Sequence, residues 1–528
     1  MRTQITKRMR RLPGWLFLFL ILALAPACQF FNGRQTLTVL AGSELQDIEP
    51  LLADIERETG IRLSFEYIGT LDGAEALLGD ADYDLAWFSH GKYLTLLQEG
   101  RGIVAAQERI MLSPVVLGIK ESKAREFGWV ENSAVTWADI AARARAGELR
   151  YAMTNPASSN SGFTALVGVA AALSGSGDAL EAGDINVAGL RDFFTGQALT
   201  AGSSGWLAES YVASQDDLNG LVNYESVLLA LNEGNLLREK LVLIYPQEGI
   251  ITADYPLMLL DAEKRELYDT LVAYLRTPEM QARLMETTLR RPVVPGIALD
   301  ARIPDVLLVE LPFPATVDVI DQLLFSYLDE QRVPAHAFFV LDVSGSMEGN
   351  GIRDLKLAMG NLTGLDTSLT GRFARFRARE KITILTFNDD VLSIDEFIVD
   401  DTHPDGEDMQ QIRSFVQSLD AGGGTAIYSA LQEAYRLAAQ AQQQAPERYY
   451  SVVLMSDGEN TDGINLVDFR RYYDGLPAAA RGIRTFAVLF GNADERSMQQ
   501  ITDATEGRLF DGRRESLSFI FKQIRGYQ

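Results

Sequence analysis

The chain has 528 residues, which is more than one hydrophobic core usually accommodates, so two or three domains are expected. Its 48 Lys and Arg against 72 Asp and Glu give a formal net charge of −24, which argues against nucleic acid as a partner and favours solubility. Cys28 is the single cysteine, so no disulfide can form within the chain.

Residues 1–27 have the pattern of a secretory signal, with basic residues before a short apolar core at 16–24. That core is too short for a comfortable membrane span of about 20 residues. Ala25-Pro26-Ala27-Cys28 resembles a bacterial lipobox, although Ala25 stands where leucine is commoner. The resemblance implies lipidation of Cys28, a short tether at 28–35 and attachment to the bacterial cell membrane outside the cytoplasm. An ordinary cleaved signal and an uncleaved anchor are the alternatives.

Strands and helices alternate in residues 36–330, which predicts a parallel sheet. Strands are predicted at 36–40, 61–67 and 83–88, and one helix is predicted to run from Ser43 to about Thr59. Ligands of such sheets bind beyond the carboxyl ends of the strands, often at helix N-termini. Small polar residues stand at those places: Ser43, Thr70 and Ser89.

A serine- and glycine-rich turn at 155–162 opens a further helix and offers N–H groups and hydroxyls to an anion or a polar solute. Residues 36–330 resemble the type II periplasmic, or extracellular, solute-binding proteins of ABC importers, most closely the branch of molybdate- and tungstate-type binders. The resemblance implies two lobes that close around a ligand by a hinge. The first lobe would comprise roughly 36–112 and 252–330 and the second roughly 115–246, with crossovers near 113–116 and 246–254.

The same resemblance implies a cleft between the lobes for a small solute or anion. Six residues are placed there: Ser43, Thr70, Ser89, Asn160, Ser161 and Tyr224. Ser43 and Ser161 have the alternative role of helix caps, and Tyr224 that of an ordinary strand tyrosine.

Residues 317–329 are predicted to form an amphipathic helix that joins this unit to residues 331–528. No long low-complexity linker separates the two units. We therefore expect them to dock closely, and we expect the helix to transmit the hinge motion of the lobes to the second unit.

An apolar stretch at 337–341 is typical of a buried parallel strand, and it is followed by Asp342, Ser344 and Ser346. Three hard oxygens at alternate positions on a strand-to-helix loop form half of a site for a hard divalent cation. This D-x-S-x-S pattern resembles the metal-ion-dependent adhesion site of the von Willebrand factor A family. Thr425, after three glycines, and Asp457, after an apolar strand, match the remaining ligands of that family.

The family resemblance covers roughly 334–528 and implies a Rossmann-like domain over 331–528, with a central, mostly parallel sheet flanked by helices. It implies Mg²⁺ at the site, although Ca²⁺ or Mn²⁺ would also fit the ligands. An acidic residue of a partner protein would complete the coordination, because the neutral Ser and Thr ligands leave the ion electropositive. The alternative is that Asp342 caps a helix and the serines only fill a loop.

The acidic stretch at 389–408 is predicted to be a solvated loop or hairpin, with a second cation site as the alternative.

Three functions from different classes are compatible with these features. The first is a membrane-anchored extracytoplasmic binding protein that combines a solute-binding clamshell with a metal-dependent protein-interaction domain. The second is the receptor of an ABC permease with the C-terminal domain as an accessory. An enzyme is disfavoured, because the sequence has no phosphate loop, no G-x-S-x-G elbow, no H-E-x-x-H helix and no evident general base beside the metal site.

Overall fold

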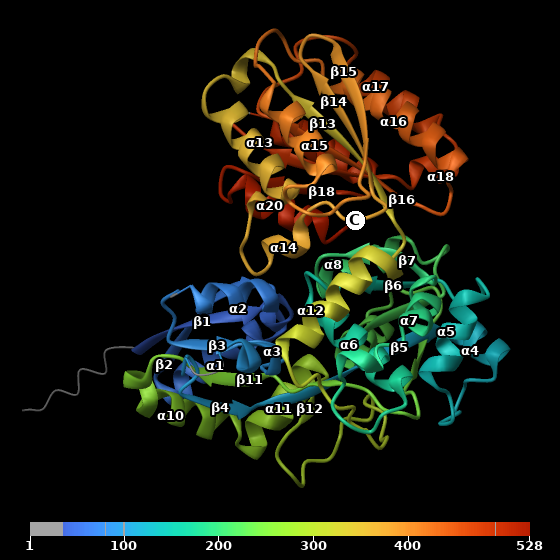
Figure 1. Ribbon diagram of the computed structural model, residues 1–528. Helices are drawn as coiled ribbons and strands as arrows, with labels where there is room; N and C mark the ends of the chain where they lie inside the picture. The colour runs from blue at the N-terminus through green and yellow to red at the C-terminus, as the bar shows by residue number, and fades with distance from the viewer. Residues whose placement is uncertain (1–34, 80, 99–100, 492) are drawn as a thin grey trace, which may run out of the picture.

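The structure is a computed structural model that describes residues 35–79, 81–98, 101–491 and 493–528 (Figure 1). The predicted signal at 1–27 and the lipidation at Cys28 lie outside these residues. No helix within the described part of the chain is long and apolar enough to cross a membrane. Two sheets form an N-terminal unit, and a third forms a C-terminal unit stacked on it.

The first sheet defines what we call the first lobe, and it runs in the order β2-β1-β3-β11-β4. Its strands are β1 (Gln35–Gly42), β2 (Ile61–Ile68), β3 (Leu85–Trp87), β4 (Ala106–Arg109) and β11 (Pro256–Leu259). β1 is parallel to β2 and β3, whereas β11 is antiparallel to its neighbours. The surrounding helices are α1 (Leu52–Thr59), α2 (Thr70–Leu78), α3 (Lys92–Leu97), α10 (Arg265–Leu275) and α11 (Pro278–Thr288).

The helix predicted after β1 is present over the predicted range, but it is not α-helical throughout. The segment begins as a 3₁₀ helix at Ser43–Leu51 and becomes α-helical only from Leu52. Pro50 lies inside the 3₁₀ segment, and proline cannot donate the backbone hydrogen bond that a continuous α-helix requires.

The second sheet defines the second lobe, in the order β10-β5-β8-β6-β7, with β9 and β12 also paired to β5. Its strands are β5 (Met111–Lys120), β6 (Tyr151–Thr154), β7 (Gln197–Ala201), β8 (Gly220–Tyr224), β9 (Leu241–Ile244), β10 (Thr252–Ala253) and β12 (Arg291–Pro292). Its helices are α4 (Glu121–Phe127), α5 (Trp137–Arg145), α6 (Asn160–Ser174), α7 (Val187–Phe194), α8 (Ser204–Ala213) and α9 (Glu225–Glu233).

The chain passes between the two lobes three times, the third time between α11 and β12, so that β12 lies in the second lobe although 252–330 was predicted to belong to the first. The first passage lies between β4 and β5, slightly before the predicted 113–116, because β5 already pairs with β12 at Met111. The second lies between β10 and β11, at 254–255, and so overlaps the end of the predicted 246–254. Tyr255 sits at this second passage with a φ of 39°, a backbone conformation that non-glycine residues rarely adopt.

The C-terminal unit contains a six-stranded sheet in the order β15-β14-β13-β16-β17-β18, parallel except at β15. Its strands are β13 (Ala335–Asp342), β14 (Lys381–Phe387), β15 (Val391–Ile398), β16 (Tyr449–Ser456), β17 (Arg484–Leu489) and β18 (Arg508–Asp511). Its helices are α13 (Asn350–Gly360), α14 (Gly371–Ala374), α15 (Glu407–Gln417), α16 (Ile427–Gln444), α17 (Leu466–Asp474), α18 (Ala478–Arg481), α19 (Glu495–Ala504) and α20 (Leu517–Arg525). β13 is buried at every residue, as its apolar sequence predicts. The acidic stretch at 389–408, predicted to be a loop or hairpin, contains the turn and second strand of the β14–β15 hairpin and then a loop that leads to α15.

The predicted joining helix is present as α12 (Val317–Ser326), which continues as a π-helical turn (Tyr327–Gln331). Its apolar face, which includes Ile320, Leu323 and Leu324, is buried. α12 contacts α3 of the first lobe and α6 of the second (Figure 1). The connection between the units is therefore itself packed against both lobes.

Candidate functional site

Polar side chains gather where β13 and β16 end in the C-terminal unit. Asp342 is the last residue of β13, and Asp457 directly follows β16. These strands are adjacent and parallel, so their carboxyl ends lie at the same edge of the sheet. Ser344 and Ser346 lie on the turn after β13, and Thr425 lies in the loop before α16. We call these five residues the oxygen cluster.

Hydrogen bonds link the members of the oxygen cluster. The Ser346 hydroxyl donates to Asp457 Oδ1 at 2.7 Å, and the hydroxyls of Ser344 and Ser346 lie 3.1 Å apart. Asp342 Oδ1 accepts from the Ser344 N–H at 2.8 Å, and its other oxygen accepts from the Ser456 hydroxyl. A Cβ placed on the neighbouring Gly458 would lie 3.3 Å from Ser346 Oγ and 3.5 Å from Thr425 Oγ1, which locates Thr425 beside the others.

Both carboxyls of the cluster are shielded from water. Asp342 is 0% exposed, and this burial raises the pKa of its carboxyl group. The negative charge of Asp457 raises that pKa further, whereas the hydrogen bonds from Ser344 and Ser456 lower it. Burial likewise raises the pKa of Asp457. A bound divalent cation would offset the cost of holding two buried negative charges close together.

The glycine-rich loop that carries Thr425 is held by several contacts. Gly423 has a φ of 89°, which only glycine adopts readily, and its carbonyl accepts from the Gly345 N–H at 3.0 Å. The Thr425 N–H donates to Thr461 Oγ1 at 3.0 Å and to Asp462 Oδ2 at 3.1 Å. Thr461 and Asp462 were not identified from the sequence, because nothing local marks a side chain that anchors a distant loop.

The oxygen cluster has the composition of a site for a hard cation. No group of three or more His, Cys, Asp or Glu in the described ranges is placed to hold a metal, so a cation here would rely on two carboxylates and three hydroxyls. All five donors are oxygens, the ligand type that Mg²⁺ prefers, and Mg²⁺ usually keeps several waters beside a few protein ligands. The residues present therefore fit Mg²⁺.

Three of the six predicted cleft residues meet between the lobes. Asn160 Nδ2 donates to Ser89 Oγ at 2.6 Å and to Tyr224 Oη at 3.1 Å, and the Tyr224 hydroxyl donates to Ser89 Oγ at 3.0 Å. Ser89 belongs to the first lobe and the other two to the second, and all three side chains are buried. We call them the cleft triad; through it the lobes touch directly.

The other three predicted cleft residues lie apart from the triad's hydrogen bonds. Ser161 bonds within the second lobe, to Thr154 at 2.8 Å and to Ser204 at 2.7 Å. Thr70 is buried, and its hydroxyl has no hydrogen-bond partner among the described residues. Ser43 is half-buried at the start of the 3₁₀ segment and does not cap it.

Residues that the sequence did not single out surround the cleft triad. Burial raises the pKa of Glu44, although a hydrogen bond from Ser89 and the charge of Arg290 oppose the shift. Arg290 donates to Asp47 Oδ1 at 2.7 Å, and its guanidinium lies 4.5 Å from the ring centre of Tyr255. Glu44 Oε1, Arg290 Nε and the Tyr255 hydroxyl are buried without hydrogen-bond partners in the described structure.

Two family models match the chain. Residues 37–288 match the family described as bacterial extracellular solute-binding protein, and residues 338–523 match the von Willebrand factor type A domain. Among curated proteins, inter-alpha-trypsin inhibitor heavy chain H3 from Pongo abelii is 26% identical over 156 residues, which is 28% of this chain. The chain matches only 16% of the length of that relative.

Solved structures resemble each part of the chain. The periplasmic binding protein AfuA from Actinobacillus pleuropneumoniae, with fructose-6-phosphate bound, has a TM-score of 0.44 at 14% identity and covers 56% of this chain and 99% of its own. The sulfate-binding protein SubI from Mycobacterium tuberculosis H37Rv has a TM-score of 0.40 at 17% identity, over 54% of this chain and 96% of its own. A von Willebrand factor type A structure from Catenulispora acidiphila has a TM-score of 0.29 at 16% identity, over 37% of this chain and 43% of its own.

The predicted fold class is confirmed. The chain joins an α/β, periplasmic-binding-protein-like N-terminal unit to a von Willebrand factor A-type C-terminal unit.

Proposed function

We propose that this chain is a membrane-anchored, extracytoplasmic binding protein that combines a solute clamshell with a Mg²⁺-dependent protein-interaction domain. The solute-binding family match supports the extracytoplasmic location, and the lipobox-like sequence at Cys28 supports the anchor. No catalytic step is part of the proposal.

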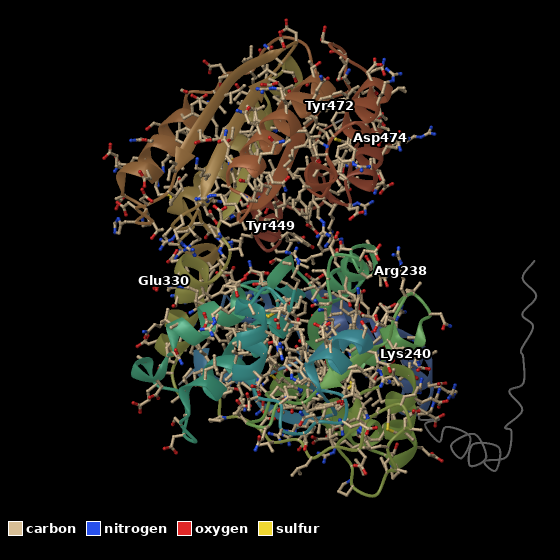
Figure 2. The ribbon with its side chains drawn as sticks, turned by 90° about the vertical axis from the view of Figure 1, so that its right-hand side faces the viewer. Arg238, Lys240, Glu330, Tyr449, Tyr472 and Asp474 are labelled. Atoms are coloured by element: carbon tan, nitrogen blue, oxygen red, sulfur yellow. The ribbon has the colours of Figure 1, made fainter. Side chains whose placement is uncertain are left out.

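The observation that carries the proposal is the oxygen cluster and its position. β13 starts at Ala335, beside the junction with the N-terminal unit, and ends at Asp342. The seven steps from Ala335 to Asp342, at about 3.3 Å each, place the cluster roughly 23 Å further from the junction. Tyr449, at the start of the neighbouring β16, lies near the boundary between the units (Figure 2). A separate protein can therefore reach the cluster while the two units stay stacked.

Each residue of the cluster has a distinct part in this proposal. Asp342 and Asp457 would supply the negative charge that attracts the cation, while Ser344, Ser346 and Thr425 would add neutral oxygens. Bound Mg²⁺ would supply an electropositive position that a carboxylate of the partner protein can complete. The hydrogen bonds from Ser456 to Asp342 and from Ser346 to Asp457 hold the carboxylates in place.

The N-terminal unit would take a small solute or anion between its lobes. Solved receptors of similar fold include one with fructose-6-phosphate bound and a sulfate-binding protein. The cleft triad is the proposed contact for the solute. Its members bond to one another here, so a solute enters only when the lobes part.

Isothermal titration of the protein with Mg²⁺ tests the proposal. Asp342→Ala should abolish Mg²⁺ binding and leave the far-UV circular dichroism spectrum unchanged, because Asp342 is the last residue of its strand and the residues before it stay as they are. Asp474→Ala is the matched control, since Asp474 is an exposed aspartate of the same unit at the C-terminal end of α17 (Figure 2). Unchanged Mg²⁺ affinity in Asp342→Ala would refute the metal site.

A further inference from the structure

The C-terminal unit rests on both lobes of the clamshell at once. It does so at the lips of the cleft, which we define as residues 69–75 of the first lobe and residues 155–159 of the second, together with neighbouring parts of α8. A Cβ on Gly69 would lie 3.1 Å from the Ser158 carbonyl oxygen, so the two lips are in contact with each other.

On the first lobe, Glu75 of α2 receives the C-terminal unit. Its carboxylate accepts from the Leu369 N–H at 2.6 Å, from the Thr370 N–H at 3.2 Å and from the Thr370 hydroxyl. Three hydrogen bonds converge on this one carboxylate. They make a strong contact, because hydrogen bonds to a charged group are stronger than those between neutral groups.

On the second lobe, the contact is mainly aromatic. The ring of Tyr527 meets that of Trp206 edge-on at 4.6 Å, and the Arg484 guanidinium lies 5.2 Å from the centre of the Trp206 ring. Arg484 also donates to Ser214 Oγ at 3.2 Å. Aromatic pairs and cation–π contacts of this kind add attraction beyond the burial of apolar area.

Two glycines allow the backbones of the units to approach closely. A Cβ on Gly526 would lie 2.7 Å from Ser158 Oγ, and one on Gly202 would lie 3.1 Å from the Tyr527 ring. The remaining space is small: a cavity of about 30 Å³ lies between Asp72, Asn155, Thr370 and Lys522. The interface is thus closely packed.

The docking surface and the cleft are parts of one structure. The second-lobe lip leads directly into α6, whose first residue, Asn160, belongs to the cleft triad. The first-lobe lip is formed largely by the N-terminal part of α2 itself. If the lobes rotated apart, Glu75 and Trp206 would separate, and the C-terminal unit could stay in contact with only one of them.

We propose that the C-terminal unit is a latch that recognises the closed clamshell through its two lips. Docking of the latch and closure of the lobes stabilise each other, because each makes its full set of contacts only when the other is in place. A solute leaves the cleft only after the latch has released. This arrangement suits a protein that reports on its solute through the metal-bearing unit, and it disfavours direct delivery of solute to a permease.

The inference goes beyond the proposed function and depends on neither a bound metal nor a known solute. Distances between pairs of spin labels test it in the full-length chain. Labels are attached at Glu263→Cys in the first lobe, Ala134→Cys in the second and Arg470→Cys in the C-terminal unit, all at exposed positions. Cys28 is the chain's only cysteine, so Cys28→Ser confines the labels to these sites.

The test variant is Glu75→Ala combined with Trp206→Ala, which weakens the latch on both lobes. Its control combines Glu266→Ala and Leu236→Ala, which truncate exposed side chains of the same two lobes. Parent and control should give three narrow distance distributions. The test variant should broaden both distances to the C-terminal unit and lengthen the distance between the lobes.

Gly526→Leu supplies an independent perturbation, because its side chain would collide with Ser158. It should produce the same lengthening, and far-UV circular dichroism checks that each variant is folded. An unchanged distance between the lobes after the C-terminal unit has released would overturn the proposal. So would docking that survives all of these substitutions.

Discussion

Replacing Glu380 by Gln removes the charge that organises the base of the C-terminal unit. Arg525 Nη2 donates to the two Glu380 oxygens at 2.7 Å and 2.8 Å, and Arg332 donates to the same carboxylate. Arg332, Glu380 and Arg525 are all buried. Glu380→Gln would take from two buried guanidinium groups the carboxylate that they share, and breaking a buried ion pair in this way costs about 3–5 kcal/mol.

For a domain of this size, about 3–5 kcal/mol corresponds to a fall of roughly 6–20 °C in the melting temperature. The two units can be followed separately in a Trp206→Phe background, because the C-terminal unit contains no tryptophan and this substitution removes the tryptophan that Tyr527 and Arg484 contact. We expect Glu380→Gln to lower the transition seen by far-UV circular dichroism well before the tryptophan fluorescence changes. Glu447→Gln, at an exposed glutamate of the same unit, is the control.

The effect has a defined pH dependence. Burial alone would raise the pKa of Glu380, but the charges of Arg525 and Arg332 outweigh it and the pKa is lowered. A lowered folded pKa contributes stability that is present above the unfolded carboxyl pKa of about 4.3 and is lost as the pH falls through the folded pKa. The difference between the parent protein and Glu380→Gln should therefore be full at pH 7 and shrink below about pH 4. Equal melting temperatures at pH 7 would refute this account of the junction.

Three further substitutions test the two candidate sites. Ser346→Ala removes a proposed ligand and the hydrogen bond to Asp457, so Mg²⁺ affinity measured by calorimetry should fall by at least about tenfold. Gly423→Ala forces alanine into a left-handed conformation, and a thermal melt should show a loss of about 1–2 kcal/mol together with weaker Mg²⁺ binding. Tyr224→Phe removes the phenol from the cleft triad and should lower N-terminal stability by about 0.5–1.5 kcal/mol in urea, followed by tryptophan fluorescence; no change would show that the triad does not hold the lobes.

The arrangement of the oxygen cluster could be predicted because its signals are local. An apolar run followed by hydroxyls and a carboxylate marks the end of a buried parallel strand, and adjacent parallel strands bring such ends to one edge. The sequence did not identify Thr461 and Asp462, which anchor the loop of Thr425 from a distant part of the chain. Their role depends on tertiary contacts that no local pattern records.

The cleft was predicted less completely. Each of the six small polar residues follows a strand or opens a helix, but such positions also serve packing within a lobe, as Ser161 shows through its bonds to Thr154 and Ser204. Glu44 and Arg290 were missed because they are separated by most of the N-terminal unit and are brought together only by its fold. The helix expected from Ser43 to Thr59 is present, but its first part, which contains Pro50, is a 3₁₀ helix.

The close docking expected from the short linker is present, but its contacts were beyond sequence reasoning. Glu75 meets Thr370 across almost 300 positions of sequence, and neither residue belongs to a motif. Gly202 and Gly526 let the two units approach closely because neither has a side chain. A sequence does not distinguish such glycines from those of ordinary turns.

The position of the oxygen cluster at one end of the third sheet, with the lobes at the other, has a mechanical consequence. A partner that pulls on the cluster while the clamshell is held would direct the force along β13 and β16. The hydrogen bonds between these neighbouring strands would then bear the load together in shear and resist it as a group. The contacts of Glu75 and Trp206 lie in series with the sheet and would break first. Tension on the protein would therefore open the clamshell before it unfolds the C-terminal unit.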